Sequence, residues 1–145
     1  MPFQWILKEC FTLDITLSIE ISATWDLLKN IWDLELRLRV VSQLRLASDK
    51  SIRIWYSNGG YHAIDALSLC TLCNLNAHET LEHFLIHCPL YSPIRNHYLE
   101  RYVTGSVNDG QGLVSLLTVA SEKQLDHLYY YVTGALKLRA FVINE

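Results

Sequence analysis

Residues 69–89, LCTLCNLNAHETLEHFLIHCP, contain three of the chain's four cysteines and three of its six histidines. Cys70 and Cys73 are separated by two residues, a spacing that lets two thiolates at a tight turn bind one ion. Nine residues lie between Cys73 and His83, and four lie between His83 and Cys88. Three thiolates and one imidazole are a complete tetrahedral set for Zn²⁺, with no open position for a substrate or water. The spacing therefore predicts a structural zinc site.

Other interpretations of the same stretch stay open. His87 is four residues after His83 on one face of the short helix predicted there, so it is an alternative ligand to Cys88 or a residue that flanks the site. The string HETLEH, from His78 and Glu79 onward, looks like a metalloprotease helix. Its histidines are five residues apart instead of four and do not share a helix face, which excludes that chemistry. A third interpretation is that these side chains are ordinary buried residues.

The composition indicates a globular intracellular chain. Half of the 145 residues are hydrophobic and 19% are charged, which is enough for a core and argues against disorder. No apolar run approaches the roughly 20 residues that a membrane helix needs, and we expect a nuclear or cytoplasmic location. Because thiols stay reduced there, clustered cysteines favour a metal over disulfides. With a net charge of −3 and a pI near 6.0, binding of nucleic acid would depend on a local basic patch.

Residues 11–21, FTLDITLSIEI, alternate strictly between hydrophobic and polar side chains. This period of two, with several β-branched residues, predicts a half-buried strand. We assign it to an N-terminal extension of residues 1–23. Because a lone strand leaves its backbone groups unpaired, we expect it to pair within the chain, with a second copy or with a partner protein.

Residues 24–145 are predicted to form one helical domain that contains a zinc module at about 66–102. Thr80 is a suitable N-cap for the short helix of that module, Pro89 stops it, and Ser121 begins a capping box. The expected fold is mainly α, with a small zinc-stapled module and one or two short β segments (α+β). The expected elements are a helix over 24–46, a hairpin of 52–56 and 61–64, a helix over 81–87, a loop over 103–112 and two helices within 113–143.

The cluster and its surroundings resemble a known family. After the two cysteines come ETLEHFL at 79–85, CPLY at 88–91 and then Arg95. This stretch is similar to the zinc-knuckle-like CCHC region at the C-terminus of insect-type non-LTR retrotransposon reverse transcriptases. VSQLRLA at 40–46 and YYYVTGALKLRAFVINE at 129–145 extend the resemblance to roughly residues 36–145. It implies that Cys70, Cys73, His83 and Cys88 bind zinc and that the chain binds RNA or single-stranded DNA.

Catalysis is not expected. The chain has no Asp-Asp pair of the kind that a polymerase requires, and no spaced carboxylate set of an RNase H stands out. The resemblance therefore covers only the tail of such a polyprotein, and we expect a non-catalytic fragment or a domesticated remnant.

Contacts to nucleic acid are expected from basic and aromatic side chains around the cluster. Zinc binding removes three thiol protons and adds two charges, which takes the formal charge from −3 to −4, so attraction to phosphate must be local. Trp55, Tyr56 and Tyr61 are candidates for stacking on unpaired bases, with strand packing as the alternative. The candidate phosphate contacts are Arg37, Arg39, Arg45, Lys50, Arg53, Arg95 and Arg101, with His97 beside the last two.

A protein-interaction domain is the alternative function. In that case zinc is only a structural staple, and the chain binds a protein partner or a second copy through residues 11–21. The acidic balance of charge favours this alternative.

Overall fold

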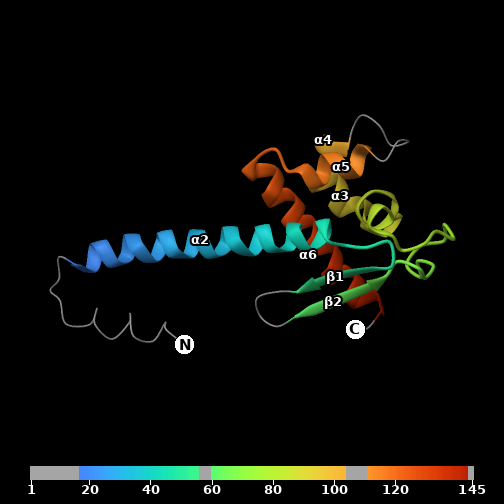
Figure 1. The fold of residues 1–145 in the computed structure, drawn as a ribbon, viewed down its shortest axis with the longest axis horizontal. Coiled ribbons are helices and arrows are strands. Elements are labelled where there is room, and N and C mark those ends of the chain that lie inside the picture. The colour runs from blue at the N-terminus through green and yellow to red at the C-terminus, as the bar shows by residue number, and fades with distance from the viewer. Residues whose placement is uncertain (1–16, 56–59, 104–110, 144–145) are drawn as a thin grey trace. The chain divides into compact units, whose positions relative to one another are not determined.

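The computed structural model describes residues 17–55, 60–103 and 111–143 (Figure 1). As the sequence predicts, the chain is mainly helical, with a small antiparallel sheet. None of the helices in these three ranges combines the length with the apolar composition that a bilayer crossing requires. The elements are α2 (Leu17–Arg45), β1 (Ser51–Trp55), β2 (Tyr61–Asp65), a π-helical turn (His83–His87), a 3-10 turn (Pro89–Tyr91), α3 (Ser92–Tyr98), α4 (Glu100–Val103), α5 (Gln111–Thr118) and α6 (Glu122–Ile143).

The chain divides into two compact units, Met1–Glu35 and Leu36–Glu145. The boundary falls inside α2, so the first part of this helix belongs to one unit and its last turns belong to the other. All elements other than α2 lie in the second unit. The predicted zinc site therefore also lies in the second unit.

The strand predicted for residues 11–21 is wrong for 17–21, because α2 begins at Leu17; residues 11–16 lie outside the described part of the chain. Extending an existing helix gives each added residue a backbone hydrogen bond within its own segment. A strand would need a partner strand for the same bonds. Residues 17–21 precede a long helical stretch, so the helix prevails over their alternating pattern.

β1 and β2 form the predicted hairpin, in which Ile52 pairs with Ile64 and Trp55 pairs with Tyr61. Ile52, Ile54 and Ile64 are buried on one face of the hairpin. Gln43 of α2 covers the free edge of β1. Its side-chain amide accepts a hydrogen bond from the N–H of Trp55 and donates one to the carbonyl of the same residue.

One core joins the elements of the second unit. It contains the last turns of α2, the inner face of the hairpin, α5 and one face of α6. Cys70 and Cys88 belong to the same core, so the cysteine cluster packs directly against the other elements of this unit. The buried residues at its centre include Val40, Leu44, Ile54, Leu116, Leu128, Val132 and Leu136.

The start of α6 confirms the predicted cap at Ser121, while Gln124 reaches one residue further back than in a standard capping box. The Ser121 hydroxyl accepts a hydrogen bond from the N–H of Gln124 at 3.2 Å. The side-chain carbonyl of Gln124 reaches back to the N–H of Ala120 at 3.0 Å. These bonds satisfy backbone donors at the start of the helix and separate α6 from α5.

Candidate metal centre

Cys70, Cys73, His83 and Cys88 converge as the sequence predicts. One ligand atom from each residue lies within 4.8 Å of the ligand atoms of the other three, and His83 Nε2 is 3.4 Å from Cys73 Sγ. All three cysteines are free thiols. With Zn–S near 2.3 Å and Zn–N near 2.0 Å, the ligand atoms of a tetrahedral zinc lie roughly 3.5–3.8 Å apart. The four side chains fit a tetrahedral metal site after small shifts.

Backbone hydrogen bonds close the loop that carries Cys70 and Cys73. The N–H of Cys70 donates to the carbonyl of Ala77 at 2.8 Å, and the N–H of Glu79 donates to the carbonyl of Ser68 at 3.0 Å. Within the loop that these bonds close, Asn76 has a φ of 50°. Asparagine tolerates this left-handed conformation better than most residues, which allows the chain to reverse there. The loop therefore presents both thiols on a fixed frame.

A π-helical turn brings the other two ligands together. The helical stretch begins at Leu81 and continues into this turn. Thr80 lies at its start, as predicted, and its Oγ1 accepts a hydrogen bond from the N–H of His83 at 3.2 Å. The N–H of Cys88 then donates to the carbonyl of His83 at 2.8 Å, across five residues. Cys88 itself leaves the helical conformation at the end of the turn, with a φ of −61° and a ψ of 120°. Cys88 therefore joins His83 at the site, while the half-exposed His87 lies 3.5 Å from the carboxylate of Glu82.

Buried side chains satisfy the carbonyl groups of the π-helical turn. The guanidinium of Arg95 donates to the carbonyls of Leu85 at 2.9 Å and Cys88 at 2.7 Å. From α6 the hydroxyl of Tyr131 donates to the carbonyl of Phe84 at 2.6 Å. Buried carbonyls without donors would be costly. Arg95 and Tyr131 therefore hold the turn that presents His83 and Cys88.

Glu79 and Arg139 form a buried ion pair beside the site. The Nε of Arg139 lies 3.0 Å from Oε1 of Glu79, and a second guanidinium nitrogen lies 3.1 Å from Oε2. The two residues are only 5% and 8% exposed. This two-point contact joins the metal-site loop to α6. The sequence carries no local signal for the pair, because its members are 60 residues apart.

Burial controls the protonation of the ligands. It raises the pKa of the Cys70 thiol and raises the pKa of Cys88 to about 12. Burial also lowers the pKa of His83, with smaller contributions in the same direction from His87 and Arg95. Without a metal, both thiols stay protonated and the imidazole stays neutral at pH 7. A bound dication offsets the cost of buried thiolates, so metal binding and loss of thiol protons are coupled.

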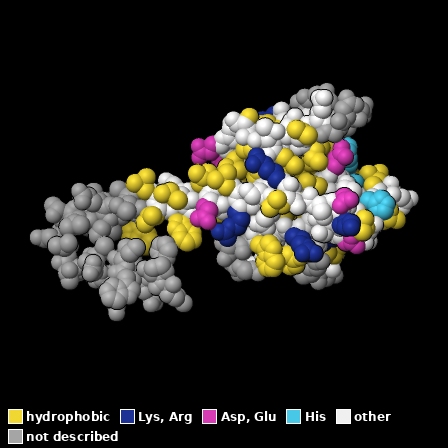
Figure 2. All heavy atoms as spheres, viewed as in Figure 1, with side chains coloured by type: hydrophobic (Ala, Val, Ile, Leu, Met, Phe, Trp, Pro, Cys, Tyr) yellow, Lys and Arg dark blue, Asp and Glu magenta, His cyan; other side chains and the backbone are white. Residues whose placement is uncertain are grey.

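Several basic residues predicted to contact nucleic acid bind other parts of the chain. Arg37 forms an ion pair with Asp126, and Arg45 donates to the carbonyl of Leu117 at the end of α5 at 2.7 Å. Arg95 is buried and donates to the carbonyl of Cys88 at the candidate site. On the face drawn in Figure 2, Lys and Arg side chains are scattered among hydrophobic ones. Of the remaining basic residues that were predicted to contact nucleic acid, Arg39 also has a partner within the chain. The others are exposed: Lys50, Arg53 and Arg101.

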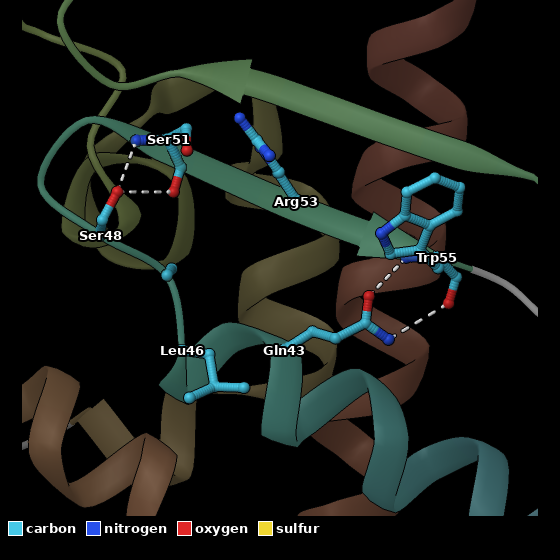
Figure 3. Close-up of a pocket in the computed structure, with 7 residues that line it drawn as sticks. Gln43, Leu46, Ser48, Ser51, Arg53 and Trp55 are labelled. Carbon is cyan, nitrogen blue, oxygen red and sulfur yellow. Dashed lines mark hydrogen bonds between the residues drawn. The ribbon is translucent and has the colours of Figure 1, made fainter.

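The outer face of the hairpin presents two exposed aromatic rings. The centroids of Trp55 and Tyr61 are 4.2 Å apart, with an angle of 35° between the ring planes; Tyr56 lies outside the described residues. Arg53 and Trp55 lie on the same face of β1, beside a pocket of about 440 Å³ between β1 and the end of α2 (Figure 3). The polar side chains that line this pocket include Gln43, Ser48, Ser51 and Arg53. We call Arg53, Trp55 and Tyr61 the hairpin surface.

Comparisons with known proteins find no match, so the function has to be inferred from the residues of the site. No family model matches the chain, and no curated protein or solved structure is significantly similar to it.

Proposed function

We propose that the chain is a non-catalytic domain that binds one structural zinc ion. The observation that carries this proposal is the convergence of Cys70, Cys73, His83 and Cys88. Three thiols and an imidazole are the ligands of closed structural zinc sites, whereas a catalytic site keeps one position for water or substrate. Zinc is favoured over harder cations because no carboxylate belongs to the group.

The bound ion would act as a cross-link within the core. It would join the Cys70–Cys73 loop to the π-helical turn, and both already pack against α6 through the contacts of Glu79 and Phe84. Structural zinc contributes its binding energy to folding. Loss of the ion should therefore destabilise the core around α2, the hairpin and α6.

Two histidines offer a matched test. His83→Ala and His87→Ala make the same change four residues apart, but only His83 belongs to the group of four. We expect elemental analysis to find about one zinc per chain in the wild type and in His87→Ala. We expect His83→Ala to lose the metal and several kcal/mol of unfolding free energy. Full zinc content and unchanged thermal stability in His83→Ala would refute the proposal.

A second candidate function is binding of RNA or single-stranded DNA at the hairpin surface. The specific observation in its favour is the exposed Trp55–Tyr61 pair beside Arg53. Exposed aromatic rings stack on unpaired bases, and a neighbouring guanidinium can contact phosphate. The similarity of residues 70–95 to the tails of non-LTR retrotransposon reverse transcriptases also supports this ligand class. In that case we infer that the chain is a tail fragment or a domesticated remnant of such an enzyme.

Two exposed tyrosines allow this second candidate to be tested. Tyr61 and Tyr130 are each 44% exposed, but Tyr130 lies on α6, where its ring is 6.0 Å from that of Tyr98 on α3. We expect Tyr61→Ala to weaken binding to a labelled oligo-uridine by about tenfold in fluorescence anisotropy, since one stacked base contributes roughly 1–3 kcal/mol. Tyr130→Ala should bind like the wild type. Equal losses in both variants, or no binding by the wild type, would exclude the hairpin surface.

Salt dependence gives a second readout for nucleic-acid binding. Of the predicted basic residues, Arg53 belongs to the hairpin surface, and the exposed Lys50 lies directly before β1. Two phosphate contacts on a single strand predict a slope of about −1.4 for the logarithm of affinity against the logarithm of salt concentration. A much steeper slope would mean that a larger basic surface binds the ligand.

A further inference from the structure

Residues 25–34 of α2, WDLLKNIWDL, form an amphipathic helical segment. At 3.6 residues per turn, its six apolar residues fall on one half of the helix and its four polar residues fall on the other half. The apolar residues are between 38% and 63% exposed. Figure 2 shows hydrophobic side chains along α2. The apolar residues are Trp25, Leu27, Leu28, Ile31, Trp32 and Leu34.

We propose that this apolar half of α2 is a dimerisation surface that pairs with the same residues of a second copy of the chain. The pairing is independent of the metal and of nucleic acid. Leu27, Ile31 and Leu34 are spaced by four and then three residues, the repeat at which two helices pack along a common seam. None of the six apolar residues is charged, so two identical surfaces meet without repulsion between like charges in a symmetric dimer.

The size of the surface fits a weak specific dimer. Six large side chains that are about half exposed present on the order of 600 Å² per copy, so the pair can bury at most about 1,200 Å². This total lies at the lower end of the range for specific protein interfaces. We therefore expect a dimer that forms at micromolar concentrations.

The polar half of the same segment disfavours a membrane as the occupant. It carries Asp26, Lys29, Asn30 and Asp33, with a net charge of −1. Helices that lie on membrane surfaces are typically rich in Lys and Arg on the polar face, which binds anionic lipid. An acidic polar face opposite an uncharged apolar face is more suited to a protein partner.

Sedimentation of the zinc-loaded full chain over a wide micromolar range tests the proposal. Leu27→Glu places a carboxylate in the seam, and Lys29→Glu places the same group two residues away on the polar half. We expect Leu27→Glu to raise the dissociation constant at least tenfold, because each dimer then contains two carboxylates in an apolar interface. Lys29→Glu should leave the constant within about threefold, since its side chain lies outside the interface. Helix content and zinc stoichiometry should match the wild type in both variants.

Three results would overturn the proposal. The first is a wild-type chain that stays monomeric over the whole concentration range. The second is a dimer that Leu27→Glu leaves intact or that both variants weaken equally, because the contact would then lie elsewhere. The third is a monomer that binds vesicles of phosphatidylcholine and phosphatidylglycerol and loses this binding in Leu27→Glu, which would assign the surface to a membrane.

Discussion

Arg139→Met is expected to be among the most destabilising single substitutions away from the metal ligands. It leaves the carboxylate of Glu79 buried without the guanidinium that now contacts both of its oxygens, at 3.0 and 3.1 Å. Removing one member of a buried ion pair typically costs about 3–5 kcal/mol, because the remaining charge has no partner and little water. This cost applies here because Glu79 and Arg139 are buried, with exposed fractions of only 5% and 8%. We expect urea denaturation of the zinc-loaded protein to show a loss in this range.

A double-mutant cycle separates the pair from its surroundings. Glu79→Met should also destabilise the chain, but less than Arg139→Met, because Arg139 has a further interaction within the chain. The double variant removes both charges and should be less destabilised than the sum of the two single variants, by about 2 kcal/mol or more. Zinc content should be measured in all three, since Glu79 is one of the groups that raise the pKa of Cys70.

A second ion pair provides the control. Arg37 and Asp126 are joined by the same chemistry, but their side chains are 20% and 32% exposed. Partly exposed pairs contribute roughly 0–1 kcal/mol. Arg37→Met should therefore cost about 1 kcal/mol or less. If Arg139→Met costs no more than Arg37→Met, or if the two single losses at the buried pair simply add, then burial is not the reason for its importance.

Two further substitutions test the supports of the fold. Tyr131→Phe removes the hydroxyl that donates to the buried carbonyl of Phe84 at 2.6 Å. It should lower the free energy of unfolding, measured by urea denaturation, by about 1–3 kcal/mol. An unchanged free energy would mean that another group satisfies this carbonyl. Arg45→Ala removes the donor to the end of α5 and should cost about 1 kcal/mol by the same measurement. Lys50 is also exposed, and Lys50→Ala should change stability little; equal losses would argue against a specific role for Arg45.

The features that the sequence predicted correctly depend on residues close together along the chain. Cys70 to Cys88, the Thr80 cap, the Ser121 cap and the hairpin all have signals within about 20 residues. The four candidate ligands are recognisable because few other roles require three cysteines and a histidine at these spacings. The sequence predicts a short helix over 81–87 but contains no evident signal for the π-helical hydrogen bond between Cys88 and His83.

The roles of the charged residues depend on contacts across long stretches of chain. Arg37 and Asp126 are 89 residues apart, and Arg45 and Leu117 are 72 residues apart. The local sequence around an arginine on a predicted helix is the same whether its side chain contacts solvent, phosphate or a distant carbonyl. Tertiary packing alone decides its partner. The prediction of a strand over 11–21, which is wrong for 17–21, failed for a related reason. An alternating pattern forms a strand only with a neighbouring strand, and for 17–21 the continuing helix provides the hydrogen bonds instead.

The buried thiols predict a steep pH dependence of metal binding. Burial raises the pKa of Cys70 and raises that of Cys88 to about 12, so each must release a proton to bind the ion at pH 7 to 8. Each released proton increases the apparent affinity about tenfold per pH unit, so these two thiols alone predict roughly a hundredfold per unit. Burial lowers the pKa of His83, so this residue adds no slope above pH 7.

The metal-free protein should respond to pH in the opposite sense. A thiol whose pKa is raised by folding stabilises the fold below its unfolded pKa, and this contribution is lost as pH rises toward the folded value. The metal-free chain should therefore lose stability above about pH 9, where the zinc-bound chain is stable because its thiolates are already compensated. Zinc competition with a chelator of known affinity at each pH, together with urea denaturation of both forms, measures the two effects. An affinity that is flat between pH 7 and 8 would mean that Cys70 and Cys88 are ionised before the ion arrives, and burial would then not govern their protonation.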